Sequence, residues 1–182
     1  MKYNTDQLIE TIESGEKIKY VFFWGHQAHP DGRITSSCFS QWWLDEFKVN
    51  NIVYRSAEHW MMARKAELFE DYEILEKIYD AKTPAEAKSL GRKVRNFIPS
   101  NWNEQKYQIV VEGNKHKFSQ NPQLKEYLLQ TNTRVLVEAS PVDRIWGIGL
   151  AKDNRDVYDP SKWRGQNLLG FALMEVRDHL IF

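Results

Sequence analysis

Apolar residues recur at helical spacing in several stretches of this chain, and polar turns separate these stretches. Residues 6–14 carry their apolar side chains on one side and are followed by Gly15, a helix stop signal. The sequence Thr83–Glu86 is a capping box with proline in the first turn, which predicts a helix to about Arg95. Further helices are predicted over residues 71–80, from Asn101 onward past Phe118, from Asn121 to Leu129 and over residues 167–180.

Other stretches are rich in β-branched and aromatic residues. Residues 19–25 (KYVFFWG) and 135–137 each predict a strand. Residues 47–54 predict a hairpin that turns at Asn50-Asn51, because asparagine tolerates positive φ. Residues 140–159 form the longest irregular stretch, and ordered loops of that length usually have a function.

The stretch from Tyr54 to Phe69 predicts a central helix with an unusual face. Glu58, Met62, Lys65 and Phe69 fall at i, i+4, i+7 and i+11, so they share one side of the helix. The two charged residues start roughly 10 Å apart, and their side chains are long enough to converge on a ligand between them. The alternative is an ordinary face with two charges at its edge, since structural ion pairs are common.

Composition suits a single globular domain. The chain has 182 residues, of which 42% are hydrophobic and 27% are charged. The elements do not alternate regularly as strand, helix, strand. We therefore expect one compact α+β domain over residues 1–182, mainly α-helical, with a small antiparallel sheet.

Charge and cysteine usage restrict the function classes. Lys plus Arg and Asp plus Glu are both 25, so the formal net charge is +0, which argues against a broad electrostatic grip on nucleic acid. The one cysteine, Cys38, excludes an internal disulfide and fits a reducing compartment. No signal-peptide pattern and no apolar run of about 18 residues is present, so we expect a cytoplasmic protein without a membrane partner.

Signatures of common enzyme classes are absent, and the five histidines do not group at metal-ligand spacing, so we expect no metal. Carboxylates, a lysine and aromatic rings remain, and this set suits cleavage of a glycosidic bond next to a flat base. Glu58 and Asp143 are the candidate acid and carboxylate for an oxocarbenium-like transition state. Lys65 offers a second route, in which its amine captures the ring-opened sugar as a Schiff base; partial burial would lower its pKa.

Several longer motifs resemble one known family, the NADAR family, also called YbiA-like. The resemblance runs from about residue 21 to the C-terminus, with the motifs in a fixed order. Enterobacterial members have an acid within a WGDG turn, where this chain has Ile148; the difference removes one carboxylate and leaves the details of base recognition open. The matching motifs are FSQWW (39–43), SAEHWMMARKAELF (56–69), AKSLGRKV (87–94), Trp102, Lys117-Phe118, VEASPVDRIWGIG (137–149) and GQNLLGFALMEVR (165–177).

The resemblance implies a mainly helical α+β domain that hydrolyses N-glycosidic bonds in ribosylated, phosphate-bearing compounds. YbiA-like members act on early riboflavin-biosynthesis intermediates, and other members remove ADP-ribose from guanine bases. No cofactor is implied. The implied catalytic residues are Glu58, Lys65 and Asp143. The implied substrate-binding residues are Phe39, Ser40, Trp102, Trp146, Gly147 and Asn167.

Plainer roles are open for each of these residues. Asp143 could turn back onto its own backbone, Lys65 could be a snorkelling surface lysine, and Asn167 could be a helix N-cap. Trp102 and Trp146 could be aromatic residues of the core. Residues 92–95 form either a phosphate clamp or a solvated helix face.

Three functions are therefore weighed. The first is an N-glycosidase acting on a small phosphorylated ribosyl-base metabolite. The second is release of ADP-ribose from guanine in nucleic acid, for which one flipped-out nucleotide would suffice. The third is a non-catalytic module that binds ADP-ribose or NAD. The sequence leaves open the physiological substrate, the oligomeric state and whether Lys65 forms a Schiff base.

Overall fold

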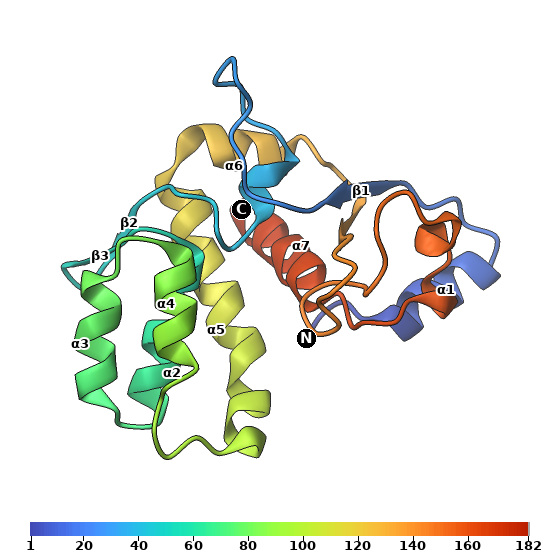
Figure 1. Cartoon of the computed structure of the whole chain (residues 1–182). Coiled ribbons are helices and arrows are strands. Elements are labelled where there is room, and N and C mark those ends of the chain that lie inside the picture. The colour runs from blue at the N-terminus through green and yellow to red at the C-terminus, as the bar shows by residue number, and fades with distance from the viewer. Residues whose placement is uncertain (182) are drawn as a thin grey trace. The chain divides into compact units, whose positions relative to one another are not determined.

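The computed structural model describes residues 1–181 (Figure 1). Contacts divide the chain into two compact units, which are described separately. Unit 1 combines Met1–Ser40 with the chain from Gln123 onward, and unit 2 is the continuous stretch Gln41–Pro122. The elements of unit 1 are α1 (Thr5–Glu13), β1 (Tyr20–Phe23), η1 (Ser36–Phe39), α6 (Pro122–Leu129, from the unit boundary), β4 (Val135–Glu138), η2 (Arg155–Tyr158), η3 (Pro160–Lys162) and α7 (Leu168–Ile181); those of unit 2 are β2 (Phe47–Val49), β3 (Ile52–Tyr54), α2 (Ala57–Leu68), α3 (Tyr72–Asp80), α4 (Pro84–Gly91) and α5 (Pro99–Gln120).

Helix α2 is the central element of unit 2, where it packs against α3, α4 and α5 (Figure 1). Its N-cap is Ser56, whose hydroxyl accepts a hydrogen bond from the His59 backbone N–H at 3.4 Å. The Trp60 indole N–H donates to the Ile109 carbonyl of α5 at 2.8 Å. A Cβ on Gly113 would lie 2.3 Å from the Trp60 ring, so α5 approaches α2 this closely only because glycine stands there.

Strands β2 and β3 form the predicted hairpin. They pair antiparallel, with Phe47 opposite Tyr54, and Asn50 and Asn51 take φ values of 48° and 68° in the turn. The ring of Tyr54 then contacts Trp60 of α2 edge-on, with the centroids 5.1 Å apart. These contacts attach the hairpin to the start of α2.

Unit 1 is built around a parallel strand pair. Strand β1 pairs with β4, Tyr20 lying opposite Val135, and helix α7 packs on β4. A Cβ on Gly170 of α7 would lie 2.1 Å from the Leu136 carbonyl oxygen, so this glycine permits the close approach of α7 to β4. The core beneath them includes Leu136 and Leu173, which have no exposed surface.

The predicted fold class is confirmed: the chain is α+β, mainly helical, with a small antiparallel sheet. Two helix boundaries were wrong. Helix α4 ends at Gly91 rather than near Arg95, because Arg95 leaves the helix to bond Asp71. Helix α5 starts at Pro99 rather than Asn101, since proline is accepted at the first helical position. The parallel β1–β4 pairing was not predicted.

Candidate functional site

Unit 2 carries Glu58 and Lys65 on one face of α2, as the sequence predicts. Glu58 is only 3% exposed, and its backbone N–H donates to the Gln41 carbonyl at 2.9 Å. Met62 and Phe69 on the same face are also buried. Three residues of this face are therefore buried, and Lys65 is half-buried.

The amine of Lys65 is surrounded by aromatic rings. Its Nζ donates to the Gly91 carbonyl at 2.8 Å and lies 4.3 Å from the Phe97 ring centroid and 5.8 Å from that of Trp102. Burial lowers the pKa of Lys65 below its ordinary value. The structure thus brings together Lys65 and Trp102, two predicted site residues from different helices. A lysine in this setting is a better nucleophile than a solvated one.

A second amine of unit 2 was missed by sequence reasoning. Lys106 of α5 is only 9% exposed, its Nζ donates to the Asn103 side-chain oxygen at 2.7 Å, and burial lowers its pKa. Lys106 follows Trp102 by four residues, so both lie on one face of α5. That spacing is the signal that could have identified it.

Of the three residues suggested as a phosphate clamp, Arg95 is held in an ion pair. The Arg95 guanidinium donates to both carboxylate oxygens of Asp71, at 2.6 and 3.1 Å, and it also contacts Glu73 at 3.1 Å. This arrangement holds the pKa of Asp71 well below its usual range. Arg92 and Lys93 are exposed. Arg95 therefore serves the fold by joining the start of α3 to the chain after α4.

In unit 1, Asp143 organises its own loop. One carboxylate oxygen accepts hydrogen bonds from the backbone N–H groups of Ile145 and Trp146, both at 2.8 Å. The Asp143 N–H donates to the Ser140 hydroxyl at 3.1 Å. This is the plainer role foreseen for Asp143, and it uses one of the two carboxylate oxygens. The side chain is half-buried.

The same loop is bonded to the start of α7. The Trp146 carbonyl accepts from the Leu169 N–H at 3.1 Å, and the Gly147 carbonyl accepts from the Asn167 N–H at 3.2 Å. A Cβ on Gly147 would lie 2.9 Å from the Glu138 carbonyl oxygen, so close packing explains this glycine. The loop satisfies N–H groups of α7 that would otherwise need a cap.

Asn167 is fully buried with φ of 53°, and it is tied to β4. Its side-chain oxygen accepts from the Glu138 N–H at 3.0 Å, and its amide nitrogen donates to the Leu136 carbonyl at 2.9 Å. The side chain therefore does not cap α7. Ile148, two residues after Trp146, is also fully buried.

Phe39 and Ser40 lie where η1 ends. The Phe39 ring has no exposed surface and contacts the rings of Phe23 and Tyr127, each with a centroid distance of 5.5 Å. It belongs to the core of unit 1. Ser40 is half-buried, and its backbone N–H donates to Ser37 at 3.1 Å.

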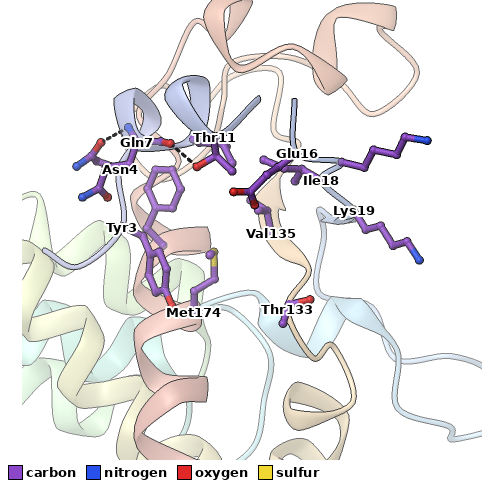
Figure 2. A pocket seen from close by; sticks show the side chains of 13 residues that line it. Tyr3, Asn4, Gln7, Thr11, Glu16, Ile18, Lys19, Thr133, Val135 and Met174 are labelled. Carbon is purple, nitrogen blue, oxygen red and sulfur yellow. Dashed lines mark hydrogen bonds between the residues drawn. The ribbon is translucent and has the colours of Figure 1, made fainter. Parts of the chain in front are cut away.

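Unit 1 also contains a cavity of about 420 Å³ that includes none of the predicted site residues. Figure 2 shows Asn4, Gln7 and Thr11 along one wall, joined by hydrogen bonds of 2.9 Å (Gln7 N–H to Asn4) and 2.8 Å (Thr11 hydroxyl to the Gln7 carbonyl). Its volume suits a small organic molecule. The lining consists of Tyr3, Asn4, Gln7, Leu8, Thr11, Glu16, Lys17, Ile18, Lys19, Thr133, Val135, Phe171 and Met174.

Two kinds of feature are absent from residues 1–181. No helix there is both long enough and apolar enough to span a membrane. No three His, Cys, Asp or Glu side chains gather there as ligands of a metal ion would.

Comparisons with known proteins agree on one family. The family model described as NADAR domain matches residues 22–181. An N-glycosidase of Acanthamoeba polyphaga mimivirus is 46% identical over 168 residues, covering 90% of this chain and 97% of that protein. The chloroplastic riboflavin biosynthesis protein PYRR of Arabidopsis thaliana is 36% identical over 114 residues, which are 60% of this chain and 17% of that protein.

A solved structure is similar to the fold described above. It is the NMR structure of the Escherichia coli protein YbiA, with a TM-score of 0.72 and 26% sequence identity. The match covers 91% of this chain and 87% of that chain. The similarity therefore extends over nearly all of the elements.

Proposed function

Because this chain belongs to the NADAR domain family, we propose that it hydrolyses the N-glycosidic bond between a phosphorylated ribose and a base in early intermediates of riboflavin biosynthesis. The chain is an enzyme of the N-glycosidase class, as its 46% identical relative is named. The choice of metabolite is supported by the name of the plant relative, a riboflavin biosynthesis protein.

The observation that carries the proposal is the position of the Lys65 amine close to the Phe97 and Trp102 rings, on the same face of α2 as Glu58. The lowered pKa of Lys65 increases the fraction of free amine near neutral pH. The half-buried Trp102 ring is available to stack on a base. Glu58 supplies a buried carboxyl for proton transfer.

These groups suit a reaction through an imine. When the ribose ring opens, the glycosidic nitrogen becomes an imine at C1′, and the free amine of Lys65 attacks that carbon. The base leaves as its amine, taking a proton that Glu58 donates, and C1′ is now bonded to Lys65. Water then hydrolyses the lysine imine and releases ribose 5-phosphate, which restores the amine. Asp143, Trp146 and Asn167 stay predicted site residues, to be tested by single substitutions.

The test compares two substrates with purified protein. One is the phosphorylated 5-amino-6-ribosylaminouracil type, and the other is an oligonucleotide carrying ADP-ribosyl-guanine. We expect ribose 5-phosphate from the first only, with kcat reduced at least a hundredfold in Glu58→Gln and Lys65→Ala. Borohydride added during turnover should attach the sugar phosphate to Lys65, as peptide mass spectrometry would detect.

Glu112→Gln and Lys115→Ala are the matched controls, because both residues are exposed on α5 of the same unit. They should keep wild-type activity. Release of ADP-ribose from the oligonucleotide would place the substrate in nucleic acid instead. Binding of ADP-ribose with no product from either substrate, unchanged by Glu58→Gln, would identify a non-catalytic module.

A further inference from the structure

Lys106 is a buried lysine without an acidic partner. Its Nζ bonds only the neutral side-chain oxygen of Asn103, at 2.7 Å, and no carboxylate among residues 1–181 lies within 4.0 Å of it. Two other charged residues of unit 2 do have an acidic partner: Lys77 pairs with Glu73 at 2.7 Å, and Arg95 pairs with Asp71. Buried lysines are rarely left without a counter-charge, because removing an ammonium from water is costly.

The position of Lys106 relates it to the candidate site. Trp102 and Lys106 are one helical turn apart on the same face of α5. The Lys65 amine lies 5.8 Å from the Trp102 ring centroid, and it also bonds only a neutral group, the Gly91 carbonyl. Trp102 thus has the Lys65 amine near its ring and Lys106 one helical turn away on its own face of α5. The proposed reaction uses Lys65 and does not use Lys106.

We propose that Lys106 binds the phosphate group of the substrate, as the anion that this buried amine otherwise lacks. A phosphate offers several acceptor oxygens and up to two negative charges, so it satisfies a buried ammonium better than a neutral amide does. This assignment separates two roles: Lys106 holds the phosphate, and Lys65 reacts at C1′. The inference rests on the proposed function for the identity of the phosphorylated sugar.

Equilibrium binding tests this role without turnover. Binding of ribose 5-phosphate and of ribose is measured by calorimetry with wild type, Lys106→Met, Lys106→Arg and Lys115→Met. We expect Lys106→Met to bind ribose 5-phosphate at least tenfold more weakly, while Lys106→Arg stays within a few-fold of wild type. Lys115→Met, a matched exposed lysine on the same helix, should behave as wild type.

Thermal stability of the free protein separates this role from a structural one. A lysine kept for a ligand reduces the stability of the empty site, so Lys106→Met should melt at the same temperature as wild type or higher. A lower melting temperature or failure to fold would overturn the proposal, and so would unchanged affinity for ribose 5-phosphate. If no substrate is turned over but Lys106→Met still loses ribose 5-phosphate binding, the proposed function fails and the phosphate site stands.

Discussion

Asp71 and Lys106 are both buried charged side chains of unit 2, and they differ in what surrounds them. The Asp71 carboxylate accepts from the Arg95 backbone and guanidinium and from the Ile74 N–H. Lys106 has one neutral partner. The first arrangement favours the charged form in the folded protein, whereas the second disfavours it. At the scale of single residues, Asp71 therefore stabilises the fold and Lys106 does not.

Asp71→Asn should destabilise the protein at neutral pH and remove part of its acid sensitivity. The folded-state pKa of Asp71 is depressed, so its contribution is complete above the unfolded pKa and is lost as pH falls through the folded one. The difference in unfolding free energy between wild type and Asp71→Asn should be constant above roughly pH 5 and shrink below it. Urea unfolding of both proteins from pH 7 to about pH 2.5 measures this difference in unfolding free energy.

Asp80→Asn is the control, because Asp80 is exposed at the end of the same helix. It should change the unfolding free energy by less than about 0.5 kcal/mol at every pH. A difference for Asp71→Asn that stayed constant down to the lowest pH would show that the carboxylate does not titrate with unfolding. That result would contradict a lowered pKa of Asp71 in the folded protein.

Single residues of the site were predictable to different degrees. Glu58 and Lys65 could be placed on one face because helical spacing depends on sequence alone. The four-residue spacing from Trp102 places Lys106 on the same helix face, but its burial could not be predicted, because NWNEQK looks like a solvated helix start until α5 packs in unit 2. The bonds from Asn167 to β4 join residues about 30 positions apart and leave no local pattern.

At the scale of elements, the packing of α2 on α5 depends on Gly113. Replacing this glycine with alanine would normally favour a helix by about 1 kcal/mol. The new Cβ would lie 2.3 Å from the Trp60 ring, and Trp60 is held by its bond to the Ile109 carbonyl. The steric conflict therefore outweighs the helix propensity.

We expect Gly113→Ala to lower the free energy of unfolding by about 1–3 kcal/mol. Equilibrium unfolding in guanidinium chloride measures this free energy. Ser119→Ala, at an exposed position of the same helix, should be neutral or slightly stabilising. Equal effects of the two substitutions would mean that α5 shifts to accommodate the added methyl group.

Local signals determined which elements could be predicted. The caps at Ser56, Asp71 and Thr83 each accept a backbone hydrogen bond at the helix start, so those starts were predicted closely. The end of α4 was not, because Arg95 is drawn out of the helix by Asp71, a tertiary contact. The pairing of β1 with β4 joins distant segments, which spacing along the chain does not reveal.

At the scale of the whole molecule, balanced charge has a consequence for solubility. The formal net charge is +0 at pH 7, so the protein gains net positive charge as the pH falls and net negative charge as the pH rises. We expect the lowest solubility near pH 7 and an increase from there toward about pH 5 and about pH 9, since uncharged proteins associate most readily. Precipitation with polyethylene glycol across this pH range measures the solubility.

Lys115→Glu combined with Lys152→Glu should raise solubility near pH 8, because both lysines are exposed and each exchange makes the net charge more negative. The corresponding double exchange to arginine keeps the charge and should change little. If both double variants behave alike, association depends on surface contacts rather than on net charge. The expectation of one domain over residues 1–182 stays a prediction at this scale.

During synthesis of the chain, strand β1 is made well before its partner strand β4. Tyr20 pairs with Val135, roughly 115 positions later, and a ribosome adds about 5–20 residues per second. The aromatic strand β1 therefore leaves the ribosome on the order of ten seconds before its partner strand exists. All of unit 2 is synthesised in that interval. Until β4 emerges, the exposed backbone and rings of Tyr20–Phe23 are a binding segment for chaperones, and a stall anywhere before residue 135 prolongs that exposure.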